Sequence, residues 1–267
     1  MVRAMTDLIA CLSALSPVPC PLSPVPCPLM SDSDFGVPIP GKILPPEVWA
    51  KTAIKKLPPP GPLDFPAIFG RQAPLVLDLG CGNGRFVLAS ALARPALDHL
   101  GVDILPLVVR YATKRANQRG LANVRLAVIG AFELLEQHIA PASILEVHLY
   151  HPQPYKDSEQ AYRLLITPEF LALARRSLVP GGLLVLQTDN PAYWQYIRRV
   201  APLLFDFEEH AGTWPDAPHG RTRREIYARQ HGLPIFRGTG RPRLDLTAEQ
   251  IADIIRTQPA PRFRAGR

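Results

Sequence analysis

The chain has 267 residues, which is enough for one large domain or two small ones with a substantial buried core. Lys and Arg exceed Asp and Glu by seven, and the segment from Arg221 to the C-terminus carries this whole excess, with eleven arginines, no lysine and four acids. No apolar run reaches the roughly 18 residues of a membrane-spanning helix, and the cysteines offer no disulfide framework, so we expect a cytoplasmic protein without a membrane partner. The confined basic segment suggests a polyanionic partner such as nucleic acid, and an Arg-rich solvated tail over 256–267 is the alternative.

The first 66 residues are rich in proline. Residues 16-SPVPCPL-22 recur unchanged as 23-SPVPCPL-29, and 58-PPPGPLDFP-66 is a second Pro-rich stretch. Because proline lacks the amide hydrogen that helices and sheets use, we expect residues 1–66 to form a disordered N-terminal region and linker. Met30, directly after the repeat, is a candidate start of translation.

Regular alternation begins at residue 75. Short apolar runs predict buried strands at 76–80, 99–104, 124–130, 145–150 and 183–189. Helices are expected at about 85–94, 106–119, 132–138, 168–178 and 191–201. This alternation predicts βαβ units, and therefore an α/β fold with a mostly parallel sheet and helices on both faces. Two late strands at 203–210 and 224–230, antiparallel at the sheet edge, bring the expected number to seven.

The strongest motif is 76-VLDLGCGNGRF-86, in which a predicted strand leads into a loop with glycine at alternate positions. Gly80, Gly82 and Gly84 let the backbone turn tightly and approach a ligand closely. The spacing is not the dinucleotide fingerprint, whose third glycine would stand at Arg85. Together with Asp78, the pattern D-x-G-x-G-x-G resembles the first motif of class I S-adenosylmethionine-dependent methyltransferases, which implies a Rossmann-like fold and S-adenosyl-L-methionine as cofactor.

Two further strand ends complete the cofactor site that this resemblance implies. Asp103 ends the second predicted strand, where an acid can accept both ribose hydroxyls of an adenosine, and Ile104 follows it. The third strand of such enzymes normally delivers an acid or amide to adenine. Here Gly130 stands in that place, so the backbone around Gly130 and Ala131, or stacking, is expected to hold the adenine.

Three segments resemble the bacterial tRNA (guanine-N7)-methyltransferase family over roughly residues 68–238. They are 69-FGRQAPLVLDLGCGNGRF-86, the central block 147–190, and 222-TRRE-225, which resembles the Thr-x-x-Glu motif of the family. The central block has Pro152-Gln153-Pro154-Tyr155 where the family has Pro-Asp-Pro-Trp, and it ends in Thr188-Asp189 as the family does. The resemblance implies methylation of guanine N7 in tRNA, in the guanine(46)-N7 class, by a methyltransferase domain at 67–240 that precedes a basic C-terminal helix and tail at 241–267.

The resemblance also implies residue roles. It assigns catalysis to Gln153 and Asp189 and a cofactor contact to Gln153. The implied substrate-binding set is Lys156, Asp157, Asp189, Thr222, Arg223, Arg224 and Glu225. Guanine N7 carries a free lone pair, so the reaction needs no general base, and Asp189 and Glu225 are expected to accept hydrogen bonds from guanine N1–H and the N2 amino group.

Two departures from the family pattern affect these expectations. Gln153 replaces an aspartate, so only a dipole would stabilise the positive charge that develops on the purine, which predicts a slower reaction. The nearly neutral 156-KDSEQAYR-163 replaces a basic stretch, which predicts weaker RNA binding unless the arginines at 221, 223 and 224 compensate.

Two other functions are compatible with the sequence. A small-molecule methyltransferase of the same fold would explain the loss of the basic stretch, with an aromatic pocket from Tyr150, Tyr155 and Tyr162. A non-catalytic RNA-binding descendant would keep the fold without an aspartate at 130 and 153. A metal site is not expected, because His148 and His151 should project to opposite faces of a strand. The sequence is compatible with a monomer or a homodimer.

Overall fold

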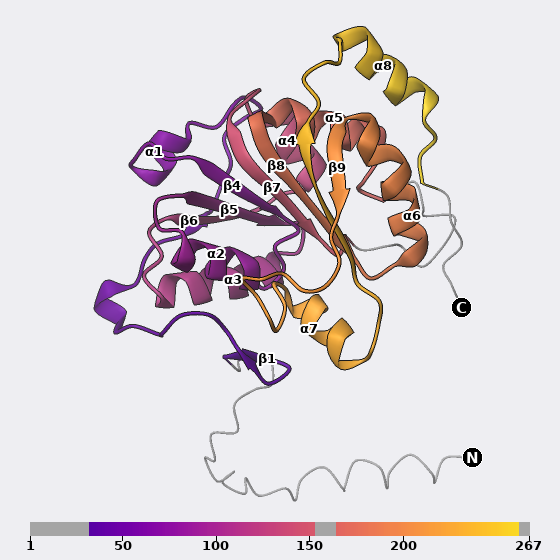
Figure 1. The fold of residues 1–267 in the computed structure, drawn as a ribbon. Coiled ribbons are helices and arrows are strands. Elements are labelled where there is room, and N and C mark those ends of the chain that lie inside the picture. The colour runs from indigo at the N-terminus through magenta and orange to yellow at the C-terminus, as the bar shows by residue number, and fades with distance from the viewer. Residues whose placement is uncertain (1–31, 153–163, 262–267) are drawn as a thin grey trace, which may run out of the picture. The chain divides into compact units, whose positions relative to one another are not determined.

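The computed structural model describes residues 32–152 and 164–261, and the described residues from Ser33 onward belong to one compact unit. Its centre is an eight-stranded sheet in the order β3-β6-β5-β4-β7-β8-β10-β9 (Figure 1). The strands of this sheet are β3 (Ala53–Ile54), β4 (Leu75–Leu79), β5 (Asp98–Asp103), β6 (Val124–Val128), β7 (Ile144–Tyr150), β8 (Leu178–Thr188), β9 (Phe205–Glu209) and β10 (Phe236–Pro242). A separate hairpin pairs β1 (Ser33–Asp34) with β2 (Val37–Pro38).

The pairing directions confirm the predicted mostly parallel α/β sheet. All neighbours from β3 to β8 are parallel, whereas β10 is antiparallel to both β8 and β9. The two-residue strand β3 adds an eighth member to the seven strands expected. Strand order reverses between β4 and β7, and the carboxyl ends at such a reversal form the crevice where open α/β sheets bind ligands.

Helices cover both faces of the sheet, as predicted (Figure 1). Buried side chains of α4 (Ala131–Gln137), α5 (Pro168–Ser177) and α6 (Pro191–Val200) belong to the largest core cluster on one face. Those of α2 (Arg85–Ala93) and α3 (Pro106–Gln118) form a second cluster on the other face. Shorter or peripheral elements are α1 (Phe65–Phe69), α7 (Arg223–Gln230), α8 (Ala248–Thr257) and the 3-10 turns η2 (Pro46–Val48) and η4 (Ala201–Leu203).

The strand expected at 224–230 is wrong, because these residues lie in helix α7. The Thr222 hydroxyl accepts the Glu225 backbone N–H at 3.1 Å and so starts the helix, which is the behaviour of a Thr-x-x-Glu N-terminal cap. The seventh long strand is instead β10, which contains two glycines. A Cβ atom at Gly238 would lie 2.6 Å from the Phe207 ring, and one at Gly240 would lie 2.9 Å from Phe205 Cβ, so close pairing with β9 requires both glycines.

The expectation of a disordered linker up to residue 66 is also wrong for residues 33–66. Asp34, Ile39 and Thr52 are buried, and β3 pairs with β6. Thr52 is held by the Asn117 side chain, which accepts from the Thr52 backbone N–H and hydroxyl, both at 2.9 Å. Proline prevents a long strand or helix here, but it does not prevent an extended segment from packing on the sheet.

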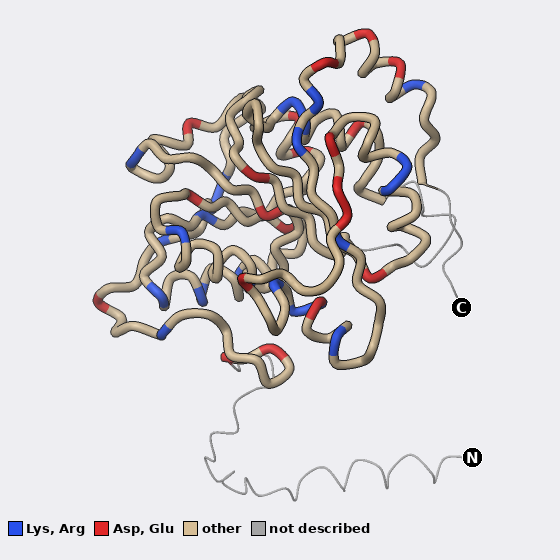
Figure 2. The backbone as a smooth tube through the Cα atoms, in the orientation of Figure 1, with Lys and Arg blue, Asp and Glu red and all other residues tan. Residues whose placement is uncertain are grey.

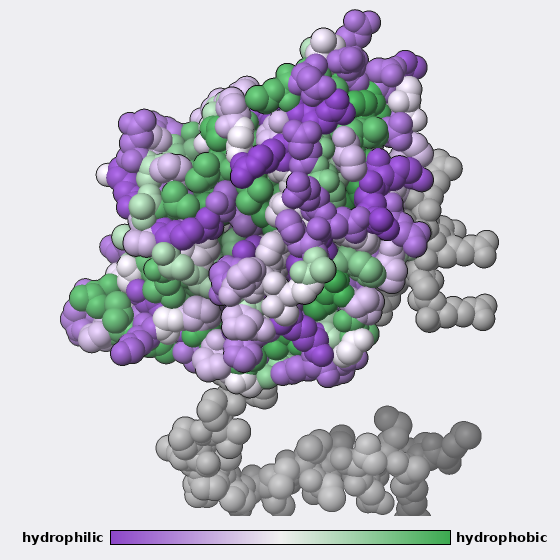
Figure 3. All heavy atoms as spheres, in the orientation of Figure 1, coloured by the Kyte–Doolittle hydropathy of each residue, from purple (hydrophilic) through white to green (hydrophobic). Residues whose placement is uncertain are grey.

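The described helices are too short or too polar for any of them to span a membrane. The face in Figure 3 mixes hydrophilic and hydrophobic residues. Repeat and start-site predictions for residues 1–31 lie outside the described residues.

Candidate active site

A cavity of about 520 Å³ opens at the carboxyl ends of β4 and β7. Four segments far apart in sequence form most of its wall, and Val108 of α3 completes it. They are the glycine loop with Asp78, the end of β7 with Tyr150 and His151, the Thr222–Tyr227 region of α7, and Phe35 of the β1–β2 hairpin. The structure therefore brings the predicted residues Asp78, Gly80, Gly82, Thr222, Arg223 and Arg224 together.

The glycine loop shows two different uses of glycine. Gly80 and Gly82 have φ of +77° and +52°, and a Cβ at either position would meet nothing within 4 Å. Glycine is therefore required at these positions for its positive φ, and the backbone stays open toward the cavity. Gly84 also has a positive φ, of +81°, but a Cβ there would lie 2.8 Å from Ala112 Cβ. Gly84 therefore permits close packing of α2 on α3, and it does not line the cavity.

Two acids stand at the glycine loop: Asp78 lines the cavity, and Asp103 lies beside the loop at the end of β5. The Asp103 carboxylate accepts the Gly82 N–H at 3.0 Å and the Leu105 N–H at 3.0 Å, which ties the glycine loop to the end of β5. Asp78 Oδ2 is buried and has no hydrogen-bond partner among the described residues. Burial, with a smaller contribution from the Asp103 carboxylate, raises the pKa of Asp78 from 3.8 to about 8. An unpaired buried carboxyl at a cavity wall fits a ligand that brings a cationic or hydrogen-bond-donating group.

The predicted adenine edge lies at the ends of β5 and β6. Ile104 is 61 % exposed, and its Cγ2 atom would lie 3.8 Å from a Cβ at Gly130. Ala131 follows as the first residue of α4. These three residues form an accessible, largely apolar edge next to Asp103, outside the main cavity.

Asp189 lies directly behind the cavity wall. His151 Nδ1 is 3.1 Å from Asp189 Oδ1, and Arg224 donates from Nε to Oδ2 at 2.8 Å. Burial alone would raise the pKa of Asp189, but the hydrogen bonds from His151 and Arg224 outweigh it and lower that pKa to about 2. Asp189 is therefore a carboxylate at any physiological pH, and its two hydrogen-bond partners among the described residues, His151 and Arg224, both line the cavity.

Glu225 has a different position from the one expected. Its side chain is fully buried, and it accepts hydrogen bonds from Gln187, Arg229 and Arg237 and from the Arg221 backbone N–H. It does not line the cavity. We therefore replace the predicted guanine contact of Glu225 with an anchoring role, in which its carboxylate fastens α7 to β8 and β10.

Comparison with known proteins gives the family. A family model described as "Putative methyltransferase" matches residues 72–237. The tRNA (guanine-N(7)-)-methyltransferase of Halorhodospira halophila is 34% identical over 186 residues, which cover 70% of this chain and 80% of the relative. That of Alkalilimnicola ehrlichii is 31% identical over 186 residues, covering 70% and 78%. The chain belongs to the tRNA (guanine-N(7)-)-methyltransferase family.

The family resemblance predicted from the sequence is thus confirmed. Another member of the tRNA (guanine-N(7)-)-methyltransferase family, from Bordetella parapertussis, is 40% identical over 134 residues, 50% of this chain and 53% of the relative. Among solved structures, a 16S rRNA (adenine(1408)-N(1))-methyltransferase from Catenulisporales acidiphilia aligns at 16% identity and a TM-score of 0.49, over 73% of this chain and 97% of that one.

Part of the predicted site of this family member lies outside the described residues. These positions are Gln153, Lys156 and Asp157, together with Tyr155 and Tyr162 of the alternative aromatic pocket. Tyr150 is described, and it is almost fully buried. Its hydroxyl accepts from Arg221 at 2.8 Å and lies 2.9 Å from His148 Nδ1, so Tyr150 supports the cavity wall mainly through hydrogen bonds.

The sequence analysis missed the β1–β2 hairpin as part of this methyltransferase site. Asp34 is 3 % exposed, accepts from Asn83 at 2.8 Å and Arg85 at 3.3 Å, and lies 3.9 Å from Arg223. Next to it, Phe35 has a φ of +50° and lines the cavity, with its ring 5.5 Å from that of Tyr227. In the sequence, only the Phe35-Gly36 pair indicates a turn here. The role of Asp34 could not be predicted, because its ionic partners are distant in sequence.

Most described arginines of the basic C-terminal segment are paired within the protein. Figure 2 shows acidic and basic residues interspersed along this part of the chain. Arg221 pairs with Asp216, Arg229 and Arg237 pair with Glu225, and Arg224 pairs with Asp189. By contrast, the Arg223 side chain is 59% exposed, and the nearest carboxylate oxygen of its acidic partner Asp34 is 3.9 Å away. Arg223 is therefore the residue of the predicted cluster that is best placed to meet a phosphate.

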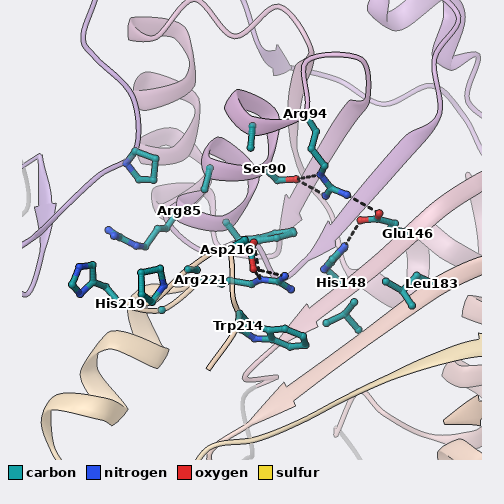
Figure 4. A pocket seen from close by; sticks show the side chains of 18 of the residues that line it. Arg85, Ser90, Arg94, Glu146, His148, Leu183, Trp214, Asp216, His219 and Arg221 are labelled. Atoms are coloured by element: carbon teal, nitrogen blue, oxygen red, sulfur yellow. Dashed lines mark hydrogen bonds and ion pairs between the residues drawn. The ribbon is translucent and has the colours of Figure 1, made fainter. Parts of the chain in front are cut away.

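A second cavity of about 510 Å³ lies between α2 and the Trp214–Arg221 segment (Figure 4). Glu146 accepts from Arg94 at 2.6 Å and lies 2.8 Å from His148 Nε2. Burial opposes ionisation of Glu146, but the hydrogen bonds from His148 and Arg94 lower its pKa to about 2. Glu146 is thus paired with Arg94 and hydrogen-bonded to His148. We infer that this wall of the second cavity supports β7 and, through it, the adjacent active site. No group of three potential metal ligands is close enough to hold an ion in the described part of the chain.

Proposed function

We propose that the protein transfers a methyl group from S-adenosyl-L-methionine to N7 of a guanine in tRNA, in the guanine(46)-N7 class. The observation that carries the proposal is one cavity whose wall combines an unpaired acid and an open glycine loop with the Thr222–Arg224 segment that holds Asp189. Membership of the tRNA (guanine-N(7)-)-methyltransferase family supports the choice of acceptor.

The cavity, together with the edge beside it at Asp103 and Ile104, fits this cofactor. The unpaired Asp78 carboxyl offers an acceptor to a cationic group, and Gly80 and Gly82 present backbone without side chains. Asp103 has lone pairs left after its two backbone contacts, which suit vicinal hydroxyls, and Ile104 and Gly130 offer an apolar edge for a flat base. When bound, S-adenosyl-L-methionine supplies an electrophilic methyl group on a sulfonium.

The acceptor side requires orientation and charge stabilisation from the protein. Guanine N7 has an in-plane lone pair and no proton to lose, so no described side chain needs to act as a base. Positive charge develops on the purine as N7 is alkylated, and an ionised carboxylate nearby stabilises that charge. Asp189 is the described residue that meets this need, and Gln153 can add only a dipole. The cytoplasm, where tRNA is found, is the expected site of action.

The direct test incubates the full chain with unmodified tRNA and labelled S-adenosyl-L-methionine, followed by nucleoside analysis for 7-methylguanosine. We expect this nucleoside to form, and we expect a Gln153→Asp change to increase the rate. In a parallel calorimetric titration, absence of cofactor binding would favour the non-catalytic protein, and cofactor binding without methyl transfer to tRNA would favour the small-molecule enzyme. Either result would refute the proposal.

Asp189→Asn separates binding from catalysis. The substitution keeps the shape of the side chain but removes the charge, so turnover should fall by roughly 100-fold while the affinity for S-adenosyl-L-methionine changes less than about threefold. Equal losses in turnover and cofactor affinity would show that Asp189 does not face the guanine.

A further inference from the structure

His151 is held through its backbone N–H and both of its ring nitrogens. It follows β7 directly, and its φ of +48° is in the left-handed region that side chains other than glycine rarely adopt. Its backbone N–H donates to the Gln187 carbonyl at 2.6 Å. Its ring contacts the Gln187 side chain through Nε2, at 2.9 Å, and Asp189 through Nδ1, at 3.1 Å. One neighbouring strand therefore fixes both the backbone and the ring.

The orientation of the Gln187 amide follows from its other partners. Trp214 Nε1 and Arg237 Nε can only donate, and both contact the same Gln187 oxygen, Oε1, at 2.6 and 3.1 Å. The Gln187 Nε2 group must then be the amide nitrogen, and it donates to the buried Glu225 carboxylate at 3.1 Å as well as facing His151. Three independent contacts, from Trp214, Arg237 and Glu225, agree on this orientation.

The orientation of Gln187 determines the tautomer of the His151 ring. Because Gln187 Nε2 donates, His151 Nε2 must accept with its lone pair, and the single proton of the neutral ring stands on Nδ1. That proton points at Asp189 Oδ1. Arg224, the other partner of Asp189, is 50% exposed and free to exchange its contact for a substrate phosphate, whereas the His151 side chain is only 4% exposed.

We propose that His151 is a positioning residue for methyl transfer: held by Gln187 in the tautomer with its proton on Nδ1, it keeps the Asp189 carboxylate oriented toward the substrate guanine. The inference rests on the proposed function and deepens it. It gives the protein a rigidly held carboxylate at the base site, which the uncharged Gln153 does not provide. It also explains why the chain accepts a strained residue just before the Pro152-Gln153-Pro154 segment.

The kinetic test compares His151→Leu, His151→Asn and a matched control, His138→Leu. His138 is equally buried but lies at the end of α4, bonded to the Gly61 carbonyl. We expect His151→Leu to lower kcat for tRNA methylation roughly tenfold to a hundredfold with the KM for S-adenosyl-L-methionine within about twofold. His151→Asn, whose amide N–H can replace Nδ1–H, should restore most of the rate. With Asp189→Asn already present, His151→Leu should cause little further loss, because His151 acts through Asp189.

A spectroscopic test does not depend on activity. In long-range ¹H–¹⁵N spectra of the full chain labelled with ¹⁵N-histidine, the ring signals that disappear in His151→Leu should show the Nδ1–H tautomer, and Gln187→Leu should release it into a mixture. A ring protonated on Nε2, additive losses in the double variant, or losses in His138→Leu equal to those in His151→Leu would overturn the inference while wild-type activity stands. Absence of 7-methylguanosine with the wild-type protein would instead overturn the proposed function and this inference with it.

Discussion

Asp78 provides a quantitative prediction, because its buried carboxyl lacks a described partner for Oδ2 and its pKa is raised from 3.8 to about 8. Between these two pH values the unfolded chain carries an ionised Asp78 while the folded, cofactor-free protein keeps it protonated. The folded state thus binds more protons, so the free energy of unfolding falls as the pH rises from about 4 to about 8. At 1.36 kcal/mol per pKa unit, the loss is on the order of 5 kcal/mol.

The Asp78→Asn change should remove this dependence. At pH 5 the variant should be less stable than the wild type by about 1–3 kcal/mol, because the new amide N–H group is buried without an acceptor. At pH 9 the order should reverse, because only the wild type must hold a buried charge. Urea denaturation of both proteins at pH 5, 7 and 9 without cofactor measures the difference. If the two stability curves run parallel from pH 5 to pH 9, the reasoning about Asp78 is refuted.

The raised pKa of Asp78 also predicts how the affinity for the cofactor changes with pH. An ionised Asp78 should bind a cationic group better than a protonated one, so the ratio of wild-type to Asp78→Asn affinity for S-adenosyl-L-methionine should increase between pH 6 and pH 8.5. Any change in the protonation of the cofactor affects both proteins equally, so it cancels in this ratio. A ratio that stays constant would show that Asp78 does not contact the cofactor.

Three further substitutions test the described site. Glu225→Ala removes the buried carboxylate that accepts from Arg237, Arg229 and Gln187 and leaves the Arg237 charge without its buried counter-charge. It should destabilise the fold by about 3–5 kcal/mol in urea denaturation, and a loss below about 1 kcal/mol would contradict the anchoring role. Asp34→Ala frees the β1–β2 hairpin from Asn83 and Arg85, so the dissociation constant for S-adenosyl-L-methionine should rise roughly tenfold in calorimetry, and an unchanged constant would show that the hairpin is not part of the cofactor site. Arg223→Ala should weaken tRNA binding and reduce its salt slope by about 1 with stability changed by less than about 0.5 kcal/mol, whereas the same change at Arg256 on α8, also exposed, should leave the slope unaltered.

The sequence predicted the parts of the fold whose causes are local. The apolar runs and the glycine loop gave strands β4 to β8 and the start of α2, because hydrophobic period and glycine spacing are visible within about ten residues. The resemblance at 69–86, 147–190 and 222–225 gave the family that the comparisons confirm. Residues 224–230 were misassigned because their short run of mixed residues fits a strand as well as a helix, and only the Thr222 cap decides between them.

The residue roles depended on contacts that no local pattern contains. The same Thr222–Glu225 motif sends Arg224 to Asp189 at the cavity and Glu225 into a buried network with Arg237, because neighbouring residues of a helix point in different directions. Asp34 joins the site through partners 49 and 51 residues away. By itself, therefore, the sequence determined the methyltransferase fold, the family and the positions of Asp78 and Asp189. Only the tertiary structure decided which charges are free to meet a ligand, because the pairing of a charge depends on strands and helices that the fold brings together.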